Sequence, residues 1–191
     1  MKNQFNIEVK CFLTDNGTEY VNNELKSYFQ SKGIIHLTTP PYAHESNGVV
    51  ERFNRTICTI VRTMLADTRR SMTVTTESEL DIEKLWGEAT ATATYIKNRL
   101  PHAALHDKYT PYEALLNHKP SISQLQPFGK MYYTHVPVER RPAGSKHAPR
   151  AERSMFVGYN EFSQSIYRVL RLKTLHVCEI QAAECQFVDN A

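Results

Sequence analysis

Residues 5–17, FNIEVKCFLTDNG, begin the part of the chain that decides its fold. Apolar and polar residues alternate from residue 5 and run into an apolar pair at 12 and 13, which predicts a strand that ends at an Asp-Asn-Gly turn. Residues 22–32 predict a short amphipathic helix that stops at Gly33, and residues 34–37 predict a second, buried strand. Such a β-α-β unit is typical of an α/β sheet, and it places Asp15 at the tip of the first strand.

A loop and a long helix follow this unit. Residues 40–48 hold two prolines, an asparagine and a glycine, which favour a turn over a helix or a central strand. From residue 49 to residue 66 the apolar positions follow helical spacing. Glu51 falls on a neighbouring stripe of this helix together with Asn54, Arg55 and Arg62. The stripe therefore presents a carboxylate beside an amide and two guanidinium groups.

The remainder changes from helix to strand. Residues 67–81 lack periodicity and predict a loop, residues 82–99 predict a second helix, and residues 110–115 predict a short helix started by proline. Short β runs beyond residue 129 predict a small barrel. Five residues of the second helix are expected in the core: Leu85, Trp86, Ala89, Ala93 and Ile96.

Composition excludes several classes of protein. The 191 residues are 41% hydrophobic and 23% charged, as in ordinary soluble proteins, and no apolar run approaches the ~20 residues that span a bilayer. No secretory signal is present, so an intracellular protein without a membrane partner is expected. The four cysteines form no CxxC pair, so free thiols are expected. The net charge of +3 arises beyond residue 128, where Arg140, Arg141, Lys146 and Arg150 share one loop.

Asp15 and Glu51 are the candidate catalytic pair, with thirty-five residues between them. Two-metal phosphoryl-transfer enzymes gather several carboxylates around cations roughly 4 Å apart, because hard divalent cations take oxygen ligands. Taken singly, each residue has a simpler explanation: Asp-Asn-Gly is a favoured turn, and glutamate is common in the first turn of a helix. The joint pattern is far more specific than either half.

The frames around this pair carry a family resemblance. TDNG at residues 14–17 and GVVERFN at residues 48–54 resemble the last two members of the Asp, Asp-35-Glu triad of retroviral and retrotransposon integrases. Five further stretches are similar, in order, to the copia class of long-terminal-repeat retrotransposon Pol polyproteins: LWGEA (85–89), YIKNRLP (95–101), TPYEAL (110–115), LQPFG (125–129) and FVGY (156–159). The resemblance covers essentially the whole chain.

The resemblance implies an α/β fold class. Residues 1–118 would be the C-terminal part of an RNase H-like integrase core whose N-terminal strands are missing. Residues 119–128 would be a linker, and residues 129–188 a small SH3-like β-barrel. In its full-length form such a protein is a metal-dependent DNA strand transferase that acts in the nucleus, with element ends, target DNA and other integrase subunits as partners.

Site residues follow from the same resemblance. Asp15 and Glu51 would hold Mg²⁺ or Mn²⁺, which activates a water or a 3′-hydroxyl. The loop residues Tyr42, Ser46 and Asn47 would approach the DNA end, and the helix face with Asn54, Arg55 and Arg62 would bind it. The basic loop would contact phosphates through Arg140, Arg141, Lys146 and Arg150. A solvated helix face explains Arg55 and Arg62 equally well, and a solvated loop does so for the basic loop.

A third carboxylate is missing from the expected site. In the family it lies on the first strand of the sheet, upstream of all residues here, and Glu8 is a poor substitute because it lies seven positions from Asp15 along the strand. We therefore expect uncovered apolar surface and a truncated or degenerate fragment that is inactive alone. A non-catalytic nucleic-acid-binding remnant and a small interaction module remain alternatives. His102 and His106 have metal-like spacing but no acidic or cysteine partners nearby, so no zinc is expected.

Overall fold

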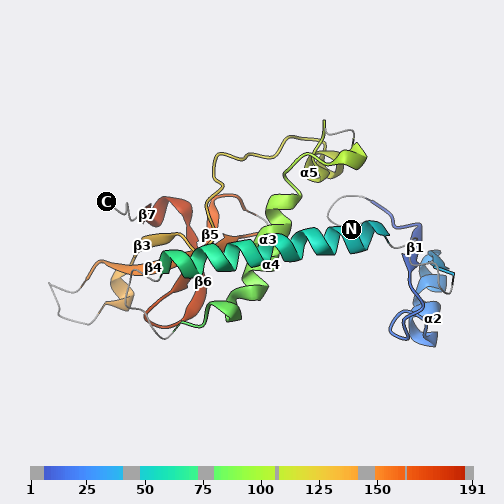
Figure 1. Cartoon of the computed structure of the whole chain (residues 1–191), viewed down its shortest axis with the longest axis horizontal. Helices are drawn as coiled ribbons and strands as arrows, with labels where there is room; N and C mark the ends of the chain where they lie inside the picture. The colour runs from blue at the N-terminus through green and yellow to red at the C-terminus, as the bar shows by residue number, and fades with distance from the viewer. Residues whose placement is uncertain are drawn as a thin grey trace. The chain divides into compact units, whose positions relative to one another are not determined.

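The computed structural model of the chain describes residues 7–40, 48–72, 80–105, 108–141, 149–161 and 163–187 (Figure 1). The chain forms two compact units, residues 1–56 and 57–191. The linker predicted at residues 119–128 rests on the family resemblance, and it stays a prediction. None of the helices in the described ranges is long and apolar enough to span a membrane.

The first unit contains the predicted β-α-β element. Strand β1 (Cys11–Thr14) pairs in parallel with β2 (Ile35–Thr38), and helix α2 (Asn23–Lys32) connects them. The Asn22 side chain accepts a hydrogen bond from the Leu25 amide at 2.8 Å, and Gly33 ends the helix with φ 65°. These local signals explain why the sequence predicted the helix correctly, whereas the predicted first strand was too long, because residues 7–10 precede β1.

One face of the β1–β2 pair packs against helix α2, whereas the side chains of the other face are exposed. On one face Phe29 of α2 packs against Phe12 and His36, with ring centroids 5.3 and 5.1 Å away. On the other face Leu13, Ile35 and Leu37 are 53%, 62% and 49% exposed. The expected uncovered apolar surface is therefore present, and the expectation that residues 34–37 are buried is wrong, because no described segment covers this side.

Helix α3 (Gly48–Met72) is longer than the sequence predicted. The expected loop is wrong over residues 67–72, which continue the helix, and residues 73–79 lie outside the described residues. Thr68 is only 1% exposed and its hydroxyl donates to the Met64 carbonyl. Tertiary burial of this last turn stabilises helix where the polar sequence alone suggested none.

The predicted helix at residues 82–99 is divided into two parts. A 3-10 helix (Ile82–Leu85) is capped by Asp81, whose side chain accepts from the Glu83 amide, and α4 (Trp86–Lys97) continues from it. Leu85, Ala89 and Ala93 are buried as expected. Placing Trp86 in the core was wrong: it is 65% exposed, because it begins α4 where the 3-10 turn ends and the helical phase shifts.

The second unit is built on a five-stranded antiparallel sheet. Helix α5 (Pro111–Leu116) precedes it, begun by proline as predicted. The strand order is β6-β5-β4-β3-β7, which confirms the predicted run of short strands. Their bounds are β3 (Met131–His135), β4 (Ala151–Tyr159), β5 (Ile166–Arg171), β6 (His176–Gln181) and β7 (Cys185–Phe187).

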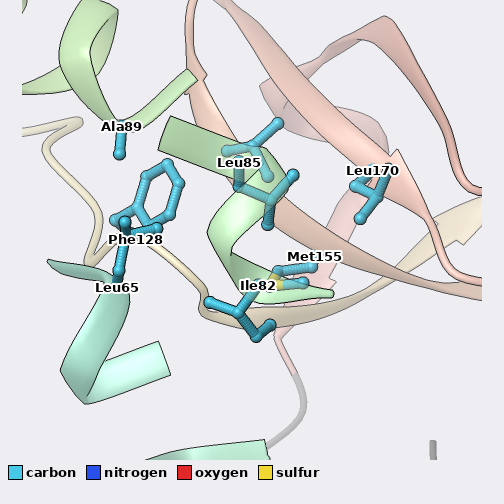
Figure 2. Packing of buried hydrophobic residues seen from close by; sticks show 8 residues of the cluster. Leu65, Ile82, Leu85, Ala89, Phe128, Met155 and Leu170 are labelled. Atoms are coloured by element: carbon cyan, nitrogen blue, oxygen red, sulfur yellow. The ribbon is translucent and has the colours of Figure 1, made fainter. Parts of the chain in front are cut away.

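Strand β4 is covered on both faces. Its residues from 154 to 159 are all buried, although a sheet with one solvated face would alternate. Met155 and Val157 join a cluster with residues of α3 and the 82–89 segment, whereas Phe156 and Tyr159 join a second, aromatic cluster. Figure 2 shows the first cluster, which includes Leu65, Ile82, Leu85, Ala89, Phe128, Met155 and Leu170. The C-terminal part of α3 and the segment from Ile82 to α4 therefore share a core with the sheet.

Candidate functional site

Asp15 lies directly after strand β1, at the carboxyl end of a parallel strand pair. Ligand sites of open α/β sheets lie at this end of the strands. The side chain is exposed, and its Oδ1 accepts a hydrogen bond from the Gly17 amide at 3.1 Å. An Asx turn thus holds one carboxylate oxygen, while Oδ2 has no hydrogen bond to any residue in the described ranges.

The residues on either side of Asp15 are both hydrogen-bonded to strand β2 or to Thr39, which directly follows it. Thr14 Oγ1 and His36 Nε2 share a hydrogen bond of 2.8 Å, and the Thr14 carbonyl accepts from the Thr39 amide at 2.9 Å. The Asn16 side-chain amide donates to the Thr39 carbonyl at 2.8 Å. Sequence analysis missed His36 and Thr39, because their role depends on the register between two strands twenty-odd residues apart.

Glu51 stands in the first turn of α3 and is exposed. The positive end of the helix dipole favours a carboxylate there, and it equally favours the anionic oxygens of a phosphate. The segment that leads from β2 to this turn, residues 41–47, lies outside the described residues. That Glu51 and Asp15 converge on one metal therefore stays a prediction.

The donor chemistry of the pair fits a hard divalent cation. Both side chains offer carboxylate oxygens, the ligands that Mg²⁺ and Mn²⁺ prefer, and both are accessible. A complete site needs more: within the described parts of the chain, no group of three or more His, Cys, Asp or Glu side chains could hold a metal ion. Asp15 and Glu51 thus fit as part of a ligand set.

The predicted DNA-binding residues on α3 are accessible. Asn54, Arg55 and Arg62 are all exposed along the helix. Near its end Arg69 pairs with Glu83, and Arg70 lies 3.9 Å from Asp67. The cationic side chains of the last turn are therefore balanced by carboxylates. Tyr42, Ser46 and Asn47, the predicted loop contacts, lie outside the described residues.

The predicted basic loop is described only in part. Arg140 ends a short 3-10 helix (Val138–Arg140), Arg150 is exposed, and Lys146 lies outside the described residues. Arg141 is half-buried, and its Nε and Nη2 donate to the Val136 carbonyl at 2.9 and 2.7 Å. These hydrogen bonds hold the guanidinium against the backbone and use only Nε and Nη2, so the predicted phosphate contact of Arg141 stays a prediction.

Arg99, within one of the motifs of the sequence, is a buried structural residue. It is 8% exposed, and its guanidinium carbon lies 3.3 Å from the ring centroid of Tyr95 and 4.6 Å from that of Tyr112. Tyr95 in turn stacks on Tyr159 at 4.2 Å. Burial lowers the pKa of Arg99 from its ordinary value, and nearby Tyr95 opposes that shift. This stack joins α4, α5 and the sheet.

Comparison with known proteins places the chain among mobile elements. It is 32% identical over 181 residues to the retrovirus-related Pol polyprotein from transposon TNT 1-94 of Nicotiana tabacum, covering 94% of this chain and 12% of that protein. It is 34% identical over 176 residues to the retrovirus-related Pol polyprotein from transposon RE1 of Arabidopsis thaliana, covering 91% of this chain and 11% of that protein. The chain thus spans about an eighth of the length of these relatives. No family model matches it.

A solved structure is also similar in part. A chain of the simian T-cell lymphotropic virus intasome in complex with PP2A regulatory subunit B56 gamma aligns with 95% of this chain and 59% of its own length. The TM-score is 0.42 and the sequence identity is 19%.

Proposed function

The chain is a homologue of one segment of the retrovirus-related Pol polyproteins from copia-type plant transposons, and on that premise we propose that it is part of an integrase. In the complete protein this part would contribute to a metal-dependent strand transferase that inserts element DNA into target DNA. Residues 1–118 would belong to an RNase H-like core, and residues 129–188, which include the five-stranded sheet, to an SH3-like domain.

One observation carries the proposal: Asp15 lies exposed at the end of a parallel strand, and Glu51 lies exposed at the start of a helix. Both positions suit a carboxylate that faces a ligand rather than a core. The similarity to the Pol polyproteins, which covers more than nine tenths of the chain, supports the same proposal.

Asp15 and Glu51 would hold Mg²⁺ or Mn²⁺ through their oxygens. The bound cation supplies activation of a water or a 3′-hydroxyl and stabilisation of the leaving oxygen. Asp15 uses Oδ1 in the Asx turn and offers Oδ2 outward, so the turn sets the direction of the free oxygen. Glu51 offers its carboxylate beside the helix N-terminus. Neither residue acts as a nucleophile.

The exposed side chains on α3 would position the DNA. Asn54 and Arg55 follow Glu51 by three and four residues, so they lie on the same side of the helix one turn further along. Contacts from guanidinium groups to phosphates fix the register of a duplex without reading its sequence. Arg62 and Arg150 are exposed and would extend such contacts.

Two carboxylates alone bind a divalent cation weakly, so we propose that the pair binds the cation detectably but supports catalysis only when another carboxylate completes the set. A non-catalytic nucleic-acid-binding role is the second candidate. It is favoured by the lack of a three-ligand group within the described residues. In that case the arginines would act without the metal.

The two candidates are separated by DNA binding with and without metal. The purified chain would be titrated into a fluorescent duplex that carries a recessed 3′ end, in Mg²⁺ or in EDTA, and followed by anisotropy. For the integrase part, Mg²⁺ tightens binding, and Asp15→Asn with Glu51→Gln abolishes that gain. Equal binding in EDTA, unchanged by these variants and weakened by Arg62→Gln, supports the non-catalytic role. No binding in either condition contradicts both candidates.

A further inference from the structure

Hydrogen bonds connect the two neighbours of Asp15 to strand β2 and to the residue that follows it. The residues joined in this way are Thr14, His36, Asn16 and Thr39, all in the first unit. We infer that Thr14 and His36 are positioning residues for the metal ligand Asp15, an inference that rests on the proposed integrase function. Groups that hold a metal ligand by hydrogen bonds set the ligand's orientation, and their loss typically weakens metal binding by about 10–100-fold.

The His36 side chain packs among aromatic rings on the covered face of the β1–β2 pair. The His36 ring lies 5.1 Å from Phe29 and 6.4 Å from Phe12, centroid to centroid, and these rings restrict its rotation. His36 Nε2 consequently stays at 2.8 Å from Thr14 Oγ1. Thr14 is 6% exposed, so this hydrogen bond is shielded from water on the threonine side.

Thr14 and Asn16 then hold Asp15 from both sides. Thr14 is bonded through its side chain to His36 and through its carbonyl to the Thr39 amide. Asn16 is bonded through its side chain to the Thr39 carbonyl. Since Thr14 is bonded to His36 of β2 and both neighbours are bonded to Thr39, the backbone of Asp15 has little freedom, although the residue itself is exposed. The Asx bond to Gly17 then leaves one carboxylate oxygen directed outward.

The turn at Asp15 has more hydrogen bonds around it than such a turn needs in order to form. A turn of Asp-Asn-Gly forms with the Asx bond alone. Here two further hydrogen bonds are added, one between His36 and Thr14 and one from the Asn16 amide to the Thr39 carbonyl, and neither involves Asp15 itself. This leaves the carboxylate available to a cation while its backbone is immobilised, which is how preorganised ligands are built.

Thr14→Val tests the inference with an isosteric change that removes only the hydroxyl. The matched control is Thr38→Val, because Thr38 is the strand partner of Thr14 and is exposed. Mn²⁺ would be titrated into the ¹⁵N-labelled chain, and its Kd taken from paramagnetic broadening of the Gly17 amide signal. Amide exchange of Gly17 without metal gives a second readout, since that amide donates to Asp15 Oδ1.

Thr14→Val is expected to weaken Mn²⁺ binding at least about tenfold and to speed Gly17 exchange, with Thr38→Val unchanged. His36→Leu should behave like Thr14→Val, and His36→Gln should restore binding, because its amide nitrogen can reach Thr14 Oγ1. Wild-type Kd and exchange in Thr14→Val and His36→Leu would overturn the positioning role while leaving the proposed function intact. If the unchanged chain shows no Asp15-dependent Mn²⁺ effect, the proposed function itself fails, and the positioning role fails with it.

Discussion

Thr68 of helix α3 lies directly against Gly129: a Cβ built on Gly129 would be 2.1 Å from Thr68 Oγ1. The glycine has φ 81°, a conformation that L side chains rarely adopt, and its amide donates to the Phe156 carbonyl at 2.9 Å. The end of α3 is therefore docked on the sheet at a place where no side chain fits. This close approach is part of the shared core of the second unit.

Gly129→Ala is expected to destabilise the second unit by about 2–4 kcal/mol, since strained backbone and overpacking add. Urea unfolding followed by circular dichroism measures the change. Gly87→Ala is the matched control: it lies in α4, a Cβ there meets nothing within 4 Å, and it should stabilise the chain by roughly 0.5–1 kcal/mol. Equal stability of both variants would contradict the docking described for Thr68 and Gly129.

The ion pair between Glu88 of α4 and Arg168 of β5 should contribute measurably to stability. Arg168 Nη2 donates a hydrogen bond to Glu88 Oε1 at 2.9 Å, Nη1 lies 2.7 Å from Oε2, and the two side chains are 32% and 22% exposed. A double-mutant cycle with Glu88→Gln and Arg168→Met is expected to give a coupling of about 1–2 kcal/mol.

The exposed pair Arg70 and Asp67 serves as the control for this cycle. Their side chains are 85% and 66% exposed and 3.9 Å apart. A coupling below about 0.5 kcal/mol is expected there, because water screens the charges. Couplings of the same size in both cycles would show that the partial burial of Glu88 and Arg168 adds nothing.

Cys185 should react slowly with alkylating agents at neutral pH. Burial raises the pKa of its thiol to about 11, with smaller contributions from Glu184 and Cys178. The reactive thiolate is therefore scarce at pH 8 and grows as the pH approaches 11. We expect iodoacetamide to modify the exposed Cys58 at least about tenfold faster than Cys185 at pH 8 in the folded chain, as followed by peptide mass spectrometry.

Urea supplies the reference for this experiment. In the unfolded chain Cys185 and Cys58 should react at similar rates, because burial is lost. A Cys185 rate equal to that of Cys58 in the folded chain would mean that the thiol is not shielded.

The uncovered face of the first unit should tolerate polar residues. Leu13→Thr and Leu37→Thr are each expected to change stability by less than about 0.5 kcal/mol, since these side chains are 53% and 49% exposed. Phe29→Ala, on the covered face and 6% exposed, should cost about 3–5 kcal/mol. Urea titration of amide signals from residues 7–40 measures all three. Losses of 2 kcal/mol or more in the leucine variants would indicate that this face is covered in solution.

The sequence alone predicted those helices whose ends are set by local signals such as caps, glycine and proline. The cap at Asn22 and the stop at Gly33 define α2, and Pro111 starts α5. It failed where tertiary packing determines the structure: α3 continues past residue 66, where Thr68 is buried against Phe128 and Gly129, and Trp86 is exposed at the point where a 3-10 turn passes into α4.

The candidate site shows the same division. Asp15 and Glu51 could be proposed from motif and spacing, and the structure places each at the end of an element. The link from His36 to Thr14 depends on strand register, which the sequence does not reveal. Spacing likewise cannot fix how the two carboxylates approach each other.

The most direct test of the integrase assignment is whether Asp15 and Glu51 bind the same cation. Mn²⁺ would be added to the ¹⁵N-labelled chain, and broadening followed at the amides of Gly17 and Arg52, each close in sequence to one carboxylate. We predict that both signals broaden together, and that either Asp15→Asn or Glu51→Gln reduces the effect at both. Broadening at one amide that is insensitive to the substitution at the other carboxylate, or none at either amide, would contradict a shared metal site.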